Sequence, residues 1–388
     1  MRYIFIVQGD GRGHTTQALA LFEILTRNGH EVIEVLMGKS PKRQIPSFFL
    51  EKINAPVSTF DSPNFQTNAE NKQSPIYKSA ALSLLQSRKY IKSINYVNDK
   101  INELQPDAVI NFYDLVAGLT YALYRPKPPM FCIAHQYLFL HPDYPFPPKK
   151  KQMIELLKLY TRFTCLGASR LLALSFTERE GIPAKNFHII PPILRKELSD
   201  YKPQKGDFFL GYMLNSGFSE EVIKWHKEQK SIPLRFFWDK KEAEDTTTID
   251  ETLQFHKIND RLFLEYMSQC KAYATTGGFE SVCEAIYYQK PVMMVPAHIE
   301  QECNAYEACE LGVGVTSKEF DLSKLLEFIP NYKPYNEFNS WLNQSEQKML
   351  SLLEDIDIQN DSFKHIPEAI SEVLLRFQRF VINSVTNI

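Results

Sequence analysis

The chain has 388 residues and a formal net charge of -2, from 44 Lys and Arg against 46 Asp and Glu, and 44% of its residues are hydrophobic. This length predicts a globular protein of two domains. The balanced charge excludes an overall positive electrostatic field that would attract nucleic acid, so we expect no nucleic-acid partner. Six cysteines without a CxxC pair, no cleavable leader and no run of 18 apolar residues predict a cytoplasmic protein with reduced cysteines.

Apolar stretches of strand length alternate with helical patterns through the first 190 residues. This alternation is typical of a parallel sheet whose strands are buried on both faces. A helix is predicted from about His14 to Asn28, and Gly29 is placed to end it in the left-handed conformation. The predicted strands are Tyr3 to Gln8, Val32 to Met37, Ala108 to Phe112, Met130 to Ala134, Leu171 to Ser175 and His188 to Ile190.

A proline-rich and charged segment, Pro191 to Gly206, separates this block from a second alternating one. We therefore expect an α/β protein with two tandem doubly wound, Rossmann-like domains, residues 1–195 and 205–365, whose ligands bind in a cleft between them. The stretch Asp239 to Asp250 is predicted to be a solvated surface turn. The predicted strands are Phe208 to Met213, Leu234 to Trp238, Leu262 to Phe263, Ala272 to Thr275, Pro291 to Val295 and Val313 to Val315.

A glycine-rich loop with a histidine follows the first predicted strand, with glycines at 9, 11 and 13 and then His14. The dinucleotide fingerprint requires a third glycine where His14 stands and an acid at the end of the second strand, which instead ends Val-Leu-Met-Gly, so a nicotinamide site is disfavoured. A histidine at this strand end could act as a general base. A histidine that packs or caps the helix is an equally good interpretation.

Asp114 is our candidate partner for that base. It follows the strand predicted to end at Phe112, so a doubly wound sheet places it at the same carboxyl edge as His14. A carboxylate there can hold the second ring nitrogen and stabilise the imidazolium that forms. Asp114 could equally cap the helix that follows it.

A second motif begins where a predicted strand meets the double glycine Gly277-Gly278 and a helix. The free backbone N–H groups and the positive end of that helix suit a diphosphate. Glu284, one turn into the helix, could accept hydrogen bonds from both ribose hydroxyls, and Glu300 and Gln301 could hold sugar hydroxyls. Each alone is more often a turn, a surface residue or a helix start, but their combination and spacing favour function.

Several motifs occur in register between Thr275 and Gly314, and another lies near the N-terminus. They are G-x-G-x-G-H at Gly9 to His14, G-G-F-x-S-x-x-E-A at Gly277 to Ala285, K-P-x-x-x-x-P at Lys290 to Pro296, E-Q at Glu300-Gln301 and N-A at Asn304-Ala305. In these motifs the chain resembles the GT-B glycosyltransferases, in the broad group that includes MurG and the UDP-glucuronosyltransferase-like enzymes. The resemblance covers most of the chain.

The resemblance implies a nucleotide-sugar donor bound mainly by the C-terminal domain, a hydroxyl acceptor (glycan, lipid or small molecule) bound mainly by the N-terminal domain, no metal, and no cofactor besides a UDP-sugar co-substrate. It also implies a final helix, 366–388, that packs back on the first domain. The implied roles are base for His14, its partner for Asp114, diphosphate contacts for Gly277, Gly278, Phe279 and Ser281, ribose contact for Glu284, donor-sugar contacts for Glu300 and Gln301, and acceptor-side positions for Gly11, Gly13, His135 and Gln136.

Two positions depart from the family pattern. Glu280 places a carboxylate in the presumed diphosphate loop, where it would repel the ligand unless it points away. Retaining members usually carry an acid where this chain has Thr276, so an inverting reaction is expected. The alternatives are a non-catalytic nucleotide-sugar or glycan binding protein and a nucleotide-sugar epimerase, although the acid and histidine cluster of the epimerases is not seen. A nicotinamide oxidoreductase is a weaker alternative.

The segment 147–166 mixes five basic residues with apolar ones, the pattern of an interfacial helix. It would permit peripheral contact with the inner face of a membrane. Packing against the core with a charged outer face explains the same pattern.

Overall fold

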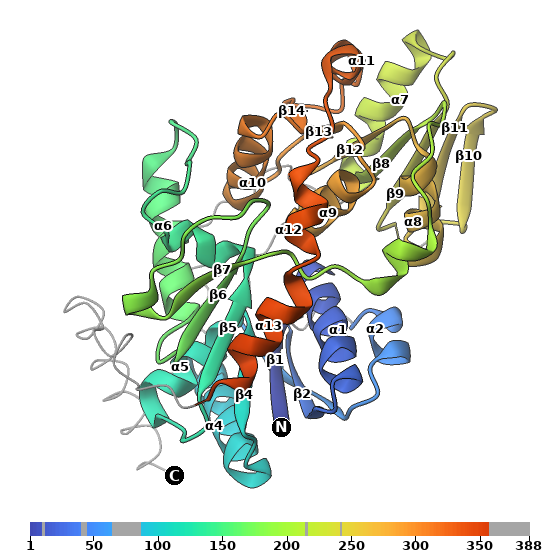
Figure 1. The fold of residues 1–388 in the computed structure, drawn as a ribbon. Coiled ribbons are helices and arrows are strands. Elements are labelled where there is room, and N and C mark those ends of the chain that lie inside the picture. The colour runs from blue at the N-terminus through green and yellow to red at the C-terminus, as the bar shows by residue number, and fades with distance from the viewer. Residues whose placement is uncertain (10–11, 40–44, 64–86, 214–215, 241–242, 357–388) are drawn as a thin grey trace.

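The computed structural model describes residues 1–9, 12–39, 45–63, 87–213, 216–240 and 243–356. Each of its two domains is a seven-stranded sheet with helices on its faces (Figure 1). The α/β class and the tandem doubly wound architecture expected from the sequence are confirmed.

The first sheet is parallel throughout and has the strand order β3-β2-β1-β4-β5-β6-β7. Its elements are β1 (Arg2–Gln8), α1 (Arg12–Arg27), β2 (Glu31–Lys39), α2 (Ser47–Lys52), β3 (Val57–Asp61), α4 (Ser87–Leu104), β4 (Ala108–Phe112), α5 (Leu115–Tyr124), β5 (Met130–Ala134), η1 (His135–Leu140), α6 (Lys151–Thr164), β6 (Arg170–Leu174), η2 (Pro183–Lys185) and β7 (Phe187–Ile190).

The second sheet has the order β10-β11-β9-β8-β12-β13-β14, and only the pairing of β10 with β11 is antiparallel among its described strands. Its elements, after the linker helix η3 (Lys196–Asp200), are β8 (Phe209–Met213), η4 (Ser216–Phe218), α7 (Ser219–Glu228), β9 (Leu234–Trp238), β10 (Thr246–Asp250), β11 (Leu253–Lys257), α8 (Asp260–Gln269), β12 (Ala272–Thr275), α9 (Phe279–Tyr287), β13 (Val292–Met294), α10 (Ile299–Glu310), β14 (Gly314–Thr316), α11 (Ser323–Phe328), η5 (Ile329–Asn331), α12 (Glu337–Leu342) and α13 (Ser345–Glu354).

Local sequence explains several of these elements. The apolar run of β1 is fully buried from Tyr3 to Val7 because helices cover both faces of its sheet. Helix α1 ends where predicted, since Gly29 has a φ of +79°, a conformation that other residues adopt only with strain. The predicted linker, Pro191 to Gly206, lies between the last strand of the first sheet and the first strand of the second.

Two predictions for the second domain were wrong. Leu262 and Phe263 lie in α8 and not in a strand, because the side chain of Asn259 accepts a hydrogen bond from the Leu262 N–H (3.1 Å) and caps a helix there. Residues 246–250, within the predicted surface turn, form the edge strand β10, whose threonines favour an extended backbone. The strands β3 and β11 were not predicted at all.

Helices α12 and α13 return the chain to the first domain, and Figure 1 shows them, in red, running from one domain to the other. The indole N–H of Trp341 donates to the Ser175 carbonyl (3.0 Å), and the Tyr3 hydroxyl donates to the Leu353 carbonyl (3.1 Å). The return thus comes before the predicted helix at 366–388, in residues that we had assigned to the C-terminal domain. Residues 366–388 lie outside those that the structure describes.

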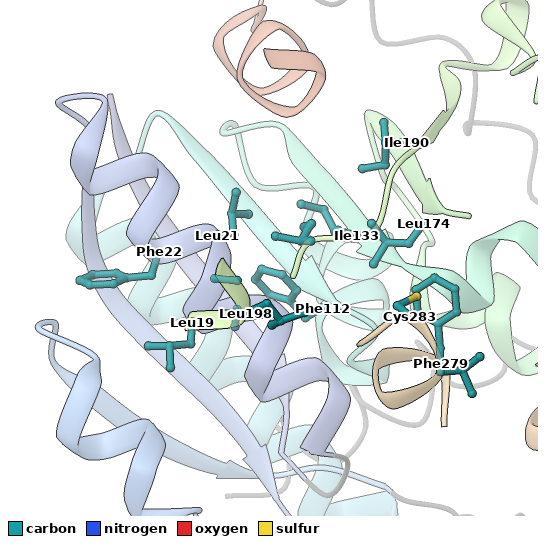
Figure 2. Packing of buried hydrophobic residues seen from close by; sticks show 14 of the residues in the cluster. Leu19, Leu21, Phe22, Phe112, Ile133, Leu174, Ile190, Leu198, Phe279 and Cys283 are labelled. Atoms are coloured by element: carbon teal, nitrogen blue, oxygen red, sulfur yellow. The ribbon is translucent and has the colours of Figure 1, made fainter. Parts of the chain in front are cut away.

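A shared hydrophobic core joins the two domains. One cluster of buried side chains runs from β1 and α1 through the ends of β6 and β7 to α9 of the second domain. Figure 2 shows Phe279 and Cys283 of α9 in the same cluster as Leu174 and Ile190 of the first domain. This packing fixes the N-terminus of α9 against the first domain.

Residues 151–164 of the basic segment at 147–166 form α6, whose apolar face is partly in the core. Ile154 and Leu157 are buried, and the Lys158 ammonium lies 4.4 Å from the centre of the Phe146 ring. Peripheral membrane contact through this segment stays a prediction. Within the described residues, no helix combines the length and the apolar character needed to cross a bilayer.

Candidate functional site

The candidate site lies where the carboxyl ends of the central strands of both sheets meet. In the first sheet β1 pairs with β4, so the loops that carry His14 and Asp114 leave neighbouring strands, as predicted. In the second sheet β8 pairs with β12, and the double glycine follows β12. Both places are the points at which a doubly wound sheet reverses its strand order, where such folds bind ligands.

His14 lies in the first turn of α1 and is 8% exposed. Its ring stacks on Tyr113, with centroids 5.5 Å apart and planes at 24°. Nδ1 is buried and has no hydrogen-bond partner among the described residues. Burial lowers the pKa of His14 to about 4, and the Gln17 side chain partly opposes this fall. The imidazole is therefore neutral at pH 7 and able to take up a proton.

Asp114 caps α5, which confirms the alternative that we had kept open for it. Its Oδ1 accepts a hydrogen bond from the Val116 N–H (2.8 Å). Its Oδ2 lies against Gly38, where an added Cβ would come within 2.1 Å of that oxygen. No hydrogen bond joins Asp114 to Nδ1 of His14, so the role of Asp114 as partner of the base stays a prediction.

The double glycine forms the start of α9. Gly277 has a φ of +89°, and Gly278 is the N-cap residue, with no side-chain hydrogen bond to the helix N–H groups. The Ser281 hydroxyl donates back to the Gly278 carbonyl (3.2 Å). The first N–H groups of α9 thus lack a side-chain cap, which is the arrangement that binds phosphate oxygens.

Glu280 turns its carboxyl group toward the first domain. Oε1 accepts a hydrogen bond from Nε2 of Gln17 (2.5 Å), and a Cβ added to Gly13 would lie 3.3 Å from Cγ of Glu280. Burial raises the pKa of Glu280 to about 8, while Gln17 lowers it. Its carboxyl group is therefore largely uncharged at pH 7, which reduces the repulsion of a diphosphate that the sequence led us to expect.

Glu284, the predicted ribose ligand, is 2% exposed and forms an ion pair with Arg195 of the interdomain linker. Oε1 of Glu284 lies 2.7 Å from the guanidinium, which also lies 3.7 Å from Asp260. Burial raises the pKa of Glu284, and Arg195 opposes this rise. The ion pair holds the carboxylate in a fixed position on α9.

Glu300 and Gln301 begin α10. Oε1 of Glu300 accepts from Nε2 of Gln136 in the first domain (2.8 Å), which joins a predicted donor-sugar ligand to a predicted acceptor-side residue. Burial raises the pKa of Glu300 to about 7. Gln301 instead braces the glycine loop, since Oε1 accepts from the Ala297 N–H (2.9 Å) and Nε2 donates to the Thr276 hydroxyl (3.3 Å).

His135 is part of the packing between the domains. It is 1% exposed and stacks on Phe279, with centroids 3.9 Å apart and planes at 13°. Its Nδ1 donates to the Leu174 carbonyl (2.8 Å). The two predicted ligand residues His135 and Phe279 thus contact each other, and their roles toward acceptor and diphosphate stay predictions. Gly11 lies outside the described residues.

Sequence reasoning gave no individual role to four residues of this site. Tyr113 and Gln17 stand next to predicted residues, one beside Asp114 and one three positions after His14, so their proximity was a usable signal. Asn304, in the N-A motif, donates to the Gly277 carbonyl (3.2 Å). Arg195 lies in the linker, where no pattern marks it. Among the described residues no group of three or more His, Cys, Asp or Glu is placed to hold a metal ion.

The chain is similar to several known glycosyltransferases. A UDP-glucuronosyltransferase 2B17 of Rattus norvegicus is 28% identical over 165 residues, which cover 39% of this chain and 31% of the rat protein. A glycotransferase of kitacinnamycin has a TM-score of 0.57 at 12% identity, with 97% of this chain and 98% of that chain covered. Phytolacca americana UGT2, complexed with UDP-2fluoro-glucose and pterostilbene, has a TM-score of 0.55 at 15% identity, with 97% and 100% covered.

At 12% and 15% identity, the two solved structures show that the fold is shared. The GT-B fold expected from the sequence is confirmed. The family assignment comes from the sequence: the protein-family model of Glycosyl transferase family 1 matches residues 1–332. This match includes the loop of His14, the double glycine and the start of α10. The chain therefore belongs to glycosyl transferase family 1.

Proposed function

We propose that this protein is an inverting, metal-independent transferase that moves a sugar from a UDP-sugar to a hydroxyl group of an acceptor. One observation carries the proposal: Gln17 on the helix of His14 hydrogen-bonds Glu280 in the first turn of α9. This contact therefore brings α1, which carries the neutral imidazole of His14, next to the N-terminus of α9, which has no side-chain cap. UDP is supported by the names of the rat relative and of the Phytolacca americana complex.

In this mechanism Nε2 of His14 takes the proton of the acceptor hydroxyl. The oxygen forms its bond to the anomeric carbon as the bond from that carbon to the diphosphate breaks on the opposite face. The displaced electron pair leaves with the diphosphate, and the proton stays on His14 until water removes it. The N–H groups at the start of α9 stabilise the negative charge that develops on the leaving group.

The first test is calorimetric titration of UDP, dTDP, GDP, ADP and NAD into the protein, each with magnesium and with EDTA. We expect UDP to bind with the same affinity in EDTA as in magnesium. Donor hydrolysis over a long incubation then separates an enzyme from a binding protein, because only an enzyme releases UDP. Binding of NAD alone, or of no nucleotide, would overturn the proposal.

The pH dependence of kcat/KM provides a second prediction. A general base must be unprotonated, and burial lowers the pKa of His14 to about 4. Because the pKa of Glu300 in the same site is raised to about 7, the measurement is made in Glu300→Gln. In this variant the rate should stay level as pH falls from 7 to about 5 and decline only as His14 becomes protonated, since kcat/KM reports the free enzyme. Circular dichroism at each pH would show that the protein remains folded. A decline centred near pH 6.5, the ordinary histidine value, would contradict the assignment.

A further inference from the structure

A buried polar cluster joins α1 to α9. His14, Gln17 and Glu280 are 8%, 2% and 9% exposed, respectively. Gln17 Nε2 donates to Glu280 Oε1 at 2.5 Å, and Gly13 permits the close approach of Glu280 to the same turn of α1. Buried polar groups cost free energy unless they are hydrogen-bonded, so such a cluster needs an explanation.

One atom of each side chain lacks a partner within the described part of the chain. These atoms are Nδ1 of His14, Oε1 of Gln17 and Oε2 of Glu280. His14 and Gln17 are three positions apart on α1, a spacing that makes them neighbours on the helix surface. Because the amide nitrogen of Gln17 faces a carboxyl oxygen, its own oxygen remains as an acceptor. The protonated Nδ1 of His14 is the matching donor. The two atoms do not meet hydrogen-bond geometry in the structure, but the Gln17 side chain acts on the ring, since it raises the pKa of His14 against the effect of burial.

We infer that Glu280, through the amide of Gln17, is the carboxyl group that positions His14 with its ring proton on Nδ1. This inference rests on the proposed function, in which His14 is the base. It assigns to a residue of the second domain the positioning role that we had predicted for Asp114, a residue of the first. The contact between the domains then determines the state of the base.

The tautomer matters because it decides which nitrogen can react. With the proton on Nδ1, the lone pair is on Nε2 and can take the proton of the acceptor. With the proton on Nε2, that nitrogen is a donor and cannot act as a base. Gln17 selects the first state by presenting an oxygen, and Glu280 keeps the amide in that orientation. As the imidazolium forms, the amide dipole and the Glu280 carboxyl stabilise its charge.

Glu280 does not need to be ionised to position His14 through Gln17. Burial raises the pKa of this group to about 8; Gln17 and Arg195 lower it, whereas Glu284 raises it further. In the neutral form Oε1 still accepts from Gln17 if the proton is on Oε2. Glu280 can thus hold Gln17 on both sides of its pKa, and its ionisation adds charge stabilisation above about pH 8.

The experiment is nitrogen-15 NMR of protein labelled in its histidine rings. The signals of His14 are identified by their absence from the spectrum of His14→Phe. In the wild type we expect a protonated Nδ1 and a bare Nε2. Gln17→Leu and Glu280→Ala should move the proton toward Nε2, whereas Glu280→Gln, which keeps an acceptor oxygen, should restore the wild-type pattern. Glu310→Ala, which removes an exposed acid of the same domain, is the control. A proton on Nε2 in the wild type, or no change in Gln17→Leu and Glu280→Ala, would overturn the inference.

Kinetics separate this inference from the proposed function. Gln17→Leu and Glu280→Ala should each lower kcat on the order of 100-fold with the donor KM nearly unchanged, and the double variant should lose little more. The tautomer measurement needs no turnover. If the wild type has the expected tautomer but transfers no sugar, the proposed function fails and the positioning stands. If the wild type transfers sugar but the variants keep its tautomer and its kcat, only the positioning fails.

Discussion

Replacing His14 by alanine is expected to lower kcat by about 1,000-fold, while the Kd for UDP stays within about twofold of the wild-type value. The reason is that, in the proposed mechanism, the imidazole acts on the acceptor proton, whereas the diphosphate binds to N–H groups of α9 in the other domain. Steady-state kinetics give kcat, and calorimetric titration gives the Kd. The loss should therefore appear in the chemical step and not in donor binding.

His188→Ala is the matched control, because this histidine also belongs to the first domain but lies in β7, away from the first turn of α1. We expect it to keep wild-type kcat. Thermal unfolding of both variants would show that the first domain is intact, since truncation of a partly buried ring can itself destabilise. Wild-type turnover in His14→Ala would mean that another group is the base.

Replacing Glu284 by alanine should weaken UDP binding by at least about tenfold and lower the free energy of unfolding by about 3 kcal/mol. The first effect follows from loss of the proposed ribose ligand. The second follows because Arg195, whose side chain is 14% exposed, would lose the carboxylate that lies 2.7 Å from it. A buried charge without its partner is costly, and Asp260 at 3.7 Å compensates only in part. Calorimetry and urea unfolding measure the two effects.

A double variant, Arg195→Leu with Glu284→Leu, separates stability from binding. Replacing both members of a buried pair with apolar side chains should recover most of the lost stability, because no charge is left unpaired. Binding of UDP should stay weak, since the ribose ligand is still absent. Glu284→Ala with wild-type affinity for UDP would show that this carboxylate only holds the linker and does not contact the nucleotide.

The predicted strands were most accurate where a strand is buried on both faces. The limits of β4, β5, β9 and β12 were predicted to the residue, because an apolar run bounded by polar residues fits only a central strand. The edge strands β3 and β10 were missed. These two are only partly buried, so their sequences, VSTFD and TTTID, lack the apolar run that marks the others. The interior strand β11 was missed as well, because its sequence, LQFHK, places polar residues beside its apolar ones.

In the candidate site, too, the sequence predicted what depends on local structure and not what depends on distant contacts. Short motifs identified His14, the double glycine and the start of α10 because each motif lies within one strand-loop-helix unit, whose geometry is local. The partners of these residues come from elsewhere. Gln17 and Glu280 are 263 positions apart, Gln136 and Glu300 are 164 apart, and Arg195 and Glu284 are 89 apart.

The sequence by itself therefore determined the α/β class, the two doubly wound domains, the family resemblance and the loops proposed to carry the chemistry, because periodicity and glycine positions act over a few residues. Only the tertiary structure decided that Glu280 contacts Gln17, that Arg195 holds Glu284 and that the chain returns to the first domain through α13. These contacts depend on how the shared core orients one sheet against the other. Many packed side chains together set that orientation, so it cannot be predicted from any short stretch of sequence.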